Sequence, residues 1–306
     1  MIAKITLGSR GSELARAQTL LVEKAIRKTH PNVTVETKII LTRGDHTKVV
    51  DLDAGRKGLF TAEIERALLA HEVNVAVHSA KDLPSQTSKA AQIAAVLPRA
   101  AVNDVLISKH SGGFASLASG ATLATGSVRR QRQLRWKRPD LNVVDLRGNV
   151  PTRLRKLAEN EWDGIVLAHA GLERLGVSAT PTEIRVDGGP FFLEVLSPEI
   201  FLPAGGQGII ALQICSDDQS VKALLDCVND RETLLCLEAE RDFLSRLHGD
   251  CNFPVGVHAT ISQGKMKLRG QVFEDKSLTP RQAEVEGACD QGPKLAADLL
   301  RKIEQE

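Results

Sequence analysis

The sequence predicts an α/β protein with two similar lobes, each built on a mixed, mostly parallel sheet, and a separate C-terminal α+β domain. Short apolar strands alternate with helical repeats through the first two thirds of the chain, which is typical of βαβ units. From about Arg231 the pattern changes to one helix, short alternating strands and a closing helix. A length of 306 residues allows two or three domains and a large buried core.

The first lobe is expected to begin with three strands and two helices. β-branched and apolar residues alternate in three short segments, and apolar residues recur at helical spacing in two longer ones. The expected elements are strands at 5–7, 33–41 and 73–77, a helix starting near 14 and a helix from 61 to about 70.

The second third of the chain repeats this arrangement, with strands expected at 123–125, 143–146 and 165–167. Gly126-Ser127 precedes basic residues as Gly8-Ser9 precedes Arg10, which favours two similar lobes. The spacings between these motifs differ from one lobe to the other, so a chance resemblance is the alternative. Residues 181–206 are rich in proline and glycine and predict a long connection. The C-terminal domain should contain strands at 255–261 and 265–272 and a helix from Pro293.

Composition narrows the class of ligand. Forty basic against 38 acidic residues give a net charge of +2, so the molecule as a whole is no polyanion binder and any anion site must come from local clustering. Aromatic residues make up 3% with no tyrosine, which disfavours a stacking platform for single-stranded nucleic acid.

The chain carries no signal for export or membrane insertion. No apolar run reaches the ~18 residues of a membrane span, and the N-terminus enters strand-like sequence without a basic and apolar leader. Five scattered cysteines without C-x-x-C spacing argue against a disulfide framework or a zinc site. We therefore expect a cytoplasmic protein without a bound metal and without membrane contact.

Basic residues follow several predicted strands directly. In α/β sheets the ligand lies beyond the carboxyl ends of the strands, where helix N-termini also favour anions. One such arginine alone is typical of a solvated helix start, but a set of them indicates a polyanionic ligand. The set is Arg10, Arg43, Lys81, Arg129, Arg130, Arg147 and Arg153, with the hydroxyls of Ser9, Ser12 and Ser127.

Two further residues could carry chemistry. Asp82 follows a buried strand beside Lys81, where an ionised carboxylate can stabilise a developing positive charge; a turn-capping aspartate is the alternative. Cys251 lies in a turn of small and polar residues and could be an exposed nucleophile. The other four cysteines, and His78 and His169, are expected to be interior packing residues, the cysteines being Cys215, Cys227, Cys236 and Cys289.

Across nearly its whole length the sequence resembles the porphobilinogen deaminase (hydroxymethylbilane synthase) family. Each shared motif is modest, but their order and joint presence are specific. The motifs are Gly8-Ser9-Arg10-Gly11-Ser12, Thr42-Arg43-Gly44-Asp45, Lys57-Gly58-Leu59-Phe60, Val77-His78-Ser79-Ala80-Lys81-Asp82, Gly126-Ser127-Val128-Arg129-Arg130, Leu146-Arg147-Gly148-Asn149, Ala170-Gly171-Leu172-Glu173-Arg174, Leu202-Pro203-Ala204-Gly205-Gly206-Gln207-Gly208 and Cys251 with Pro254.

The resemblance implies two lobes like those of type II periplasmic binding proteins and a C-terminal α+β domain. Their limits would be 1–98 with 209–226, 103–202 and 231–306. It also implies a cytoplasmic monomer that condenses four porphobilinogen molecules head to tail with loss of ammonia, giving hydroxymethylbilane. A dipyrromethane cofactor, made from the substrate and joined to Cys251 by a thioether, would prime the chain.

The resemblance also assigns roles to single residues. Asp82 would be catalytic and would stabilise the azafulvenium cation left by ammonia loss. The loop before Phe60 would cover the site, with Lys57 and Phe60 as lid residues; Asp53 and Asp250 depart from the family pattern, at a loop lysine and at the glycine before the cysteine. The cofactor would be held by Cys251, Lys81, Ser127, Arg129 and Arg130, and the substrate carboxylates by Arg10, Ser12, Gln18, Arg147, Arg153 and Arg174.

Two other classes of function compete with this hypothesis. A two-lobed anion receptor would share the arginines but has no use for an alkylated cysteine or for Asp82. A nucleic-acid binder is suggested by residues 129–138, where six of ten are basic, but near-neutral net charge and few aromatic residues weigh against it.

Overall fold

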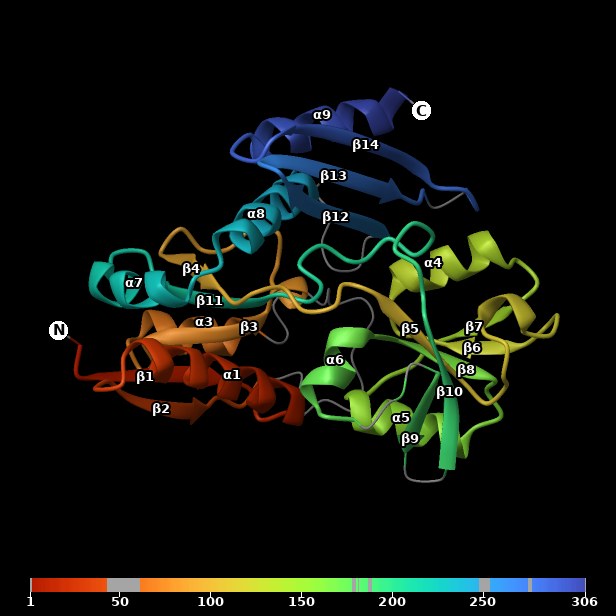
Figure 1. Ribbon diagram of the computed structural model, residues 1–306, viewed down its shortest axis with the longest axis horizontal. Coiled ribbons are helices and arrows are strands. Elements are labelled where there is room, and N and C mark those ends of the chain that lie inside the picture. Colours follow the sequence, from red (N-terminus) through yellow and green to blue (C-terminus); the bar gives the residue numbers. More distant parts are fainter. Residues whose placement is uncertain are drawn as a thin grey trace.

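The computed structural model describes residues 2–42, 61–177, 180, 182–186, 189–247, 254–274 and 277–305. It consists of three sheets with their helices (Figure 1). The expected lid residues Lys57 and Phe60, and the expected cofactor attachment residue Cys251, lie outside the described residues.

The first lobe is a five-stranded sheet in the order β2-β1-β3-β11-β4. Strand β1 pairs in parallel with β2 and β3, whereas β11 runs antiparallel to both β3 and β4. The strands are β1 (Lys4–Ser9), β2 (Thr34–Ile39), β3 (Val75–Ser79), β4 (Ala91–Val96) and β11 (Ile210–Cys215). The helices are α1 (Glu13–Thr29), α3 (Ala62–Leu69) and α7 (Gln219–Leu225), with short 3₁₀ turns η1 (Ala80–Asp82) and η3 (Asp226–Val228).

The second lobe is a six-stranded sheet in the order β7-β6-β8-β5-β10-β9. Strand β6 is parallel to β7 and β8, and β5, β10 and β9 add antiparallel pairs. The strands are β5 (Asp104–Ser108), β6 (Thr122–Ala124), β7 (Asn142–Val144), β8 (Gly164–Ala168), β9 (Glu183–Val186) and β10 (Gly189–Val195). The helices are α4 (Val128–Lys137), α5 (Val150–Glu159) and α6 (His169–Arg174), with the turn η2 (Phe114–Ser116).

The two lobes share one strand arrangement. In each, the first parallel strand lies between the second and third, and an antiparallel strand continues beside the third. This confirms the predicted fold class. The antiparallel part of both sheets is larger than the local pattern indicated, because β11 and β10 return to strands far away in the sequence.

The prediction of a long connection at 181–206 is wrong in part, because this segment contains β9 and β10. Pro190 stands at the beginning of β10, where a strand tolerates proline. Gly189, directly before it, pairs with Val186 of β9 and has φ +132°, a conformation that favours glycine. Buried Ile184, Phe191 and Leu193 then complete the core of the second lobe.

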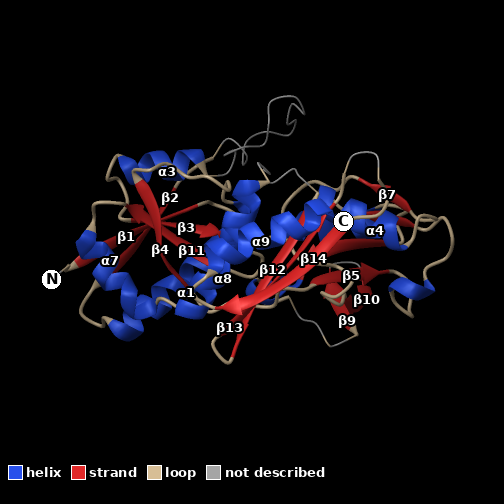
Figure 2. Ribbon diagram, turned by 90° about the horizontal axis from the view of Figure 1, so that it is seen from above, coloured by secondary structure: helices blue, strands red, loops and turns tan. Residues whose placement is uncertain are grey.

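The C-terminal domain packs two helices on one face of an antiparallel sheet in the order β12-β13-β14. Its elements are α8 (Arg231–Arg246), β12 (Val255–Ser262), β13 (Lys265–Val272), β14 (Arg281–Ala288) and α9 (Gly292–Gln305). Phe243, Leu268 and Leu299 are among its fully buried core residues. Seen from above, the domain lies across the junction of the two lobes (Figure 2).

Two segments connect the lobes, 97–103 between β4 and β5 and 196–209 between β10 and β11. Helix α8 contacts β4 on one side and β12 and α9 on the other, so it joins the C-terminal domain to the first lobe. The domain limits given above stay predictions. Within the described segments, no helix combines the length and the apolar character that crossing a bilayer requires.

Candidate active site

A pocket at the carboxyl ends of β1 and β3 brings together four of the predicted site residues. Its lining includes Arg10, Ser12, Gln18 and Asp82. Because β1 and β3 are parallel neighbours, the residues that follow them emerge at the same edge of the sheet. Four of the predicted first-lobe residues therefore meet at one place, and Lys81 is not among the described residues lining it.

Local hydrogen bonds hold this edge together. Ser12 is the N-cap of α1, and its Oγ accepts a bond from the Ala15 amide at 3.3 Å, as expected for a serine at a helix start. Buried Gln18, farther along α1, donates through Nε2 to Ser79 Oγ at 2.8 Å. Gln18 thus ties the first helix to the end of β3, next to the turn that carries Asp82.

The Asp82 turn is held by the segment that returns to the first lobe. The Ala80 amide donates to the Ile209 carbonyl at 3.0 Å, and the Leu83 amide closes the turn onto the Ala80 carbonyl at 3.2 Å. Gly206 has φ +73° and lies so close that a Cβ there would be 2.9 Å from the Ala80 carbonyl carbon. The Asp82 side chain is exposed, and Lys81 is half-buried.

Arg129 and Arg130, in the first turn of α4, are buried and share one carboxylate. Arg129 Nη2 lies 2.9 Å from Asp104 Oδ2, and Arg130 Nη2 lies 2.8 Å from Asp104 Oδ1. Gln207 Nε2 adds a third donor at 2.8 Å. Burial alone would raise the pKa of Asp104, but the two guanidiniums hold it well below its usual range. Two cations on one anion leave this buried cluster with a net positive charge.

Lys81 extends the positive cluster toward the first lobe. Burial, followed by the charge of Arg130, lowers the pKa of Lys81 to about 8, against the opposing effect of Asp82 and Asp104. The Asp82 turn of the first lobe and the start of α4 in the second lobe therefore lie close enough for their charges to interact. This places two carboxylates, Asp82 and Asp104, and three cations around one junction.

The cluster has donors suited to a ligand with several carboxylates. Within the described residues, the buried Nε atoms of Arg129 and Arg130 have no hydrogen-bond partner, and the Ser127 hydroxyl makes no capping bond at the start of α4. Buried donors without an acceptor are costly, so a bound anion at this place would stabilise them. The residues present therefore fit an acidic organic cofactor.

Three further predicted arginines belong to the second lobe and have partners there or in the 196–209 connection, whereas Arg43 lies outside the described residues. Arg147 pairs with Asp145 at 2.5 Å and is exposed, and Arg153 Nε donates to the Gly148 carbonyl at 2.7 Å at the start of α5. Arg174 is half-buried and donates from Nη2 to the Gly208 carbonyl, and burial lowers its pKa. The described residues lining the Asp82 pocket do not include these three.

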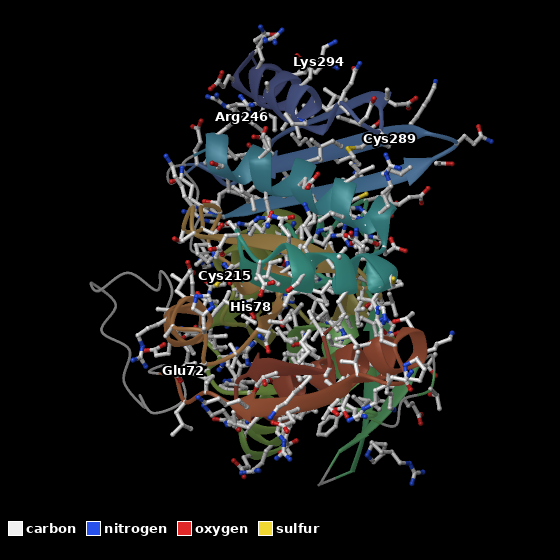
Figure 3. The ribbon with its side chains drawn as sticks, turned by 90° about the vertical axis from the view of Figure 1, so that its left-hand side faces the viewer. Glu72, His78, Cys215, Arg246, Cys289 and Lys294 are labelled. Atoms are coloured by element: carbon white, nitrogen blue, oxygen red, sulfur yellow. The ribbon has the colours of Figure 1, made fainter. Side chains whose placement is uncertain are left out.

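His78 is an interior residue, as expected. It is buried inside the first lobe (Figure 3), and its Nε2 lies 3.1 Å from Gln213 Oε1. Burial lowers the pKa of His78 to about 4, with the positive charges of Arg241 and Arg10 adding to the effect. His169 is half-buried, 3.9 Å from Glu173.

The expectation for the cysteines is wrong at one position. Cys215 and Cys236 are buried and Cys289 is half-buried, but Cys227 is exposed, because the turn η3 that carries it lies at the surface. Among the residues that the structure describes, no group of three or more histidine, cysteine or acidic side chains could hold a metal ion.

Sequence reasoning missed Asp104, which organises the arginine cluster. A usable signal was present, because an aspartate opens the otherwise apolar strand Asp104–Ser108 and a carboxylate at a buried position needs a cationic partner. It also missed the buried Glu240, which takes Arg99 as its ion-pair partner at 2.6 Å.

Comparison with known proteins gives these features a family. Residues 5–223 match the family described as "Porphobilinogen deaminase, dipyromethane cofactor binding domain", and residues 234–304 match "Porphobilinogen deaminase, C-terminal domain". A porphobilinogen deaminase of Roseiflexus sp. (strain RS-1) is 43% identical over 300 residues, which cover 97% of this chain and 95% of the relative. Those of Nitrobacter winogradskyi and Syntrophomonas wolfei are each 40% identical, covering 98% of this chain and 92% and 93% of the relatives.

Among solved structures, the methionine-binding protein MetQ matches 76% of this chain and 92% of its own at 13% identity, with a TM-score of 0.44. The relatives, by contrast, match from end to end at 40% identity or more, and both family domains occur in order along the chain. The chain belongs to the porphobilinogen deaminase family.

Proposed function

We propose that Asp82 and the cations around it carry out the porphobilinogen deaminase reaction in this chain. In that reaction four porphobilinogen molecules are joined head to tail, one ammonia leaves at each joining, and water releases hydroxymethylbilane for tetrapyrrole biosynthesis. The observation that carries the proposal is the pocket in which Asp82 meets Arg10, Ser12 and Gln18.

The chemistry follows from the charges of that pocket. Asp82 is the one carboxylate among its described lining residues, and the side chains of Arg10, Ser12 and Gln18 can donate hydrogen bonds. These donors can bind the acetate and propionate groups of a pyrrole. Asp82 can stabilise the cation that forms when ammonia leaves, because a fixed charge lowers the energy of an opposite charge that develops beside it.

The buried cluster of arginines around Asp104 fits the cofactor. Lys81, Ser127, Arg129 and Arg130 would hold the carboxylates of a dipyrromethane, since Asp104 neutralises one of the two buried arginines and the cluster stays positive. When bound, the dipyrromethane supplies the free pyrrole carbon to which the first substrate is joined. Cys251 would hold it by a carbon–sulfur bond. The sulfur would join the aminomethyl carbon of a porphobilinogen unit as the carbon–nitrogen bond there breaks, and the amino group would leave as ammonia with the thiol proton.

Substrate carboxylates beyond the Asp82 pocket would be taken by Arg147, Arg153 and Arg174 from the second lobe. Arginine matches a carboxylate with two parallel hydrogen bonds, so these side chains can exchange their present local partners for a ligand. We further propose Lys57 and Phe60 as lid residues, a cytoplasmic location and a monomeric state.

Intact-mass measurement of the purified chain tests the proposal. We expect a mass above the sequence value by one dipyrromethane, consumption of porphobilinogen, and loss of both in Cys251→Ala. Cys227→Ala is the matched control, because Cys227 is an exposed cysteine on η3 of the first lobe; it should keep both. An unmodified chain that binds porphobilinogen without consuming it would instead establish an anion receptor and refute the proposal.

A further inference from the structure

We propose that Arg241, on α8 of the C-terminal domain, is a positioning residue for Asp82. This inference rests on the proposed role of Asp82. It assigns to a helix outside both lobes the task of keeping the catalytic carboxylate at its place in the pocket.

The contact is direct and lies just beyond Asp82 in the chain. Arg241 Nη2 donates to the Pro84 carbonyl at 2.8 Å and to the Ser85 carbonyl at 3.2 Å. Hydrogen bonds from a charged donor are stronger than those between neutral groups. The Arg241 side chain is half-buried, as are Pro84 and Ser85, so these hydrogen bonds are partly shielded from water.

Apolar packing joins the same two elements. Leu237, one helical turn before Arg241, is fully buried in a cluster with Ala80 and Leu83, the residues on either side of Lys81 and Asp82. Leucine and arginine at i and i+4 lie on the same face of α8, so this face carries both the apolar and the polar contact to the turn.

The turn is also supported, through Gly206, by the neighbouring residue of α8. Glu240 is fully buried and accepts from the Gly206 amide at 2.7 Å, from the Ala259 amide at 2.8 Å and from Arg99 at 2.6 Å. Gly206 in turn packs against the backbone of Ala80 and Lys81. Glu240 and Arg241 therefore fix the turn from two directions.

The turn depends on this support because it has little internal hydrogen bonding. Leu83 is extended, with φ −72° and ψ 136°, as expected before a proline, and Pro84 has no amide donor. Helix α8 also ends at Arg246, shortly before Cys251 in the chain. The same helix would thus carry the residue that positions Asp82 and precede, in the chain, the cysteine to which the cofactor is attached.

The test compares Arg241→Gln and Arg241→Lys with the control Arg246→Gln. Arg246 is on the same helix but exposed, pairs with Asp242 at 2.7 Å and lies at the edge of the C-terminal domain (Figure 3). We expect Arg241→Gln to lower kcat by about 10-fold or more with KM within about threefold, since small displacements of a reacting group cost large factors in rate. Arg241→Lys should recover part of kcat, and Arg246→Gln should match the unsubstituted chain.

Two readouts separate positioning from a general loss of stability. In a double-mutant cycle with Asp82→Glu, the effect of Arg241→Gln on kcat should shrink, because the carboxylate is already displaced; full additivity would overturn the proposal. Hydrogen exchange of amides 80–86 should quicken in Arg241→Gln and stay unchanged in Arg246→Gln, and equal exchange in both would also overturn it. If Arg241→Gln does not fold, the same double-mutant cycle is measured with Arg241→Lys, and that result decides between positioning and a general loss of stability.

The exchange readout does not require turnover. If the unsubstituted chain fails to consume porphobilinogen, the proposed function fails while the contact between Arg241 and the turn can still be measured.

Discussion

Asp104 and Arg130 form a buried ion pair, with 2.8 Å between Asp104 Oδ1 and Arg130 Nη2. The same carboxylate holds Arg129, so one anion orients two guanidiniums at the start of α4. Their positions depend on Asp104, a residue that is not among the described residues lining the Asp82 pocket.

Replacement of that anion is the first prediction. Asp104→Asn should destabilise the chain by about 3–5 kcal/mol, because removal of one partner leaves buried charges uncompensated. It should also abolish cofactor loading, as judged by intact mass. Asp140→Asn, which breaks the exposed pair with Arg138 at 2.7 Å, is the control and should change little. Equal denaturant midpoints for the two variants would show that the buried cluster is not needed for stability.

The second prediction concerns Asp82 itself. Asp82→Asn should lower kcat by about 10²–10³-fold, since it removes one preorganised charge at the reacting centre. The side chain is exposed, so the thermal midpoint should stay close to that of the unsubstituted chain. Steady-state kinetics check the first statement and calorimetry the second. Asp298→Asn, at a half-buried aspartate of α9 that pairs with Arg301, should leave both unchanged; retention of normal kcat in Asp82→Asn would remove Asp82 from the mechanism.

The third prediction tests the close approach of Gly206 to the Asp82 turn. Gly206→Ala and Gly264→Ala both place alanine at positive φ, +73° and +75°, which costs about 1–2 kcal/mol. At Gly264 nothing lies within 4 Å, whereas at Gly206 the Ala80 carbonyl carbon and the Lys81 nitrogen lie 2.9 and 3.0 Å from the new Cβ. Gly206→Ala should therefore be the less stable variant and should lose at least about 10-fold in kcat. Similar unfolding free energies and rates for both would contradict this.

The fourth prediction is a pH dependence. Burial and the charge of Arg130 lower the pKa of Lys81 to about 8, so Lys81 is charged below that pH and neutral above it. Its attraction for a carboxylate is therefore present below pH 8 and lost as the pH rises through it. Loading of cofactor-free chain by porphobilinogen, followed by intact mass, should slow between pH 7.5 and 9.

Lys81→Arg provides the control, because arginine stays charged throughout this range. Loading of Lys81→Arg should be nearly constant from pH 7.5 to 9. A parallel decline in both proteins would show that another group titrates.

The sequence by itself determined those strands and helices of the lobes that show local apolar periodicity, and which residues follow each of those strands. Apolar periodicity is a local property, so β1, α1, α3, β3 and β13 lie where it predicts them. The carboxyl ends of parallel neighbours share an edge, which is why Arg10, Ser12, Gln18 and Asp82 meet at one pocket.

Only the tertiary structure decided which distant groups become partners. Asp104 meets Arg129 and Arg130 because β5 lies beside β8 in the second sheet, and Arg241 meets Pro84 because α8 packs on the first lobe. The hairpin of β9 and β10 likewise depends on a place beside β5 for Phe192 and Leu193. Such pairings join residues far apart in the chain, and their free energy depends on the packing of whole elements, which no local pattern contains.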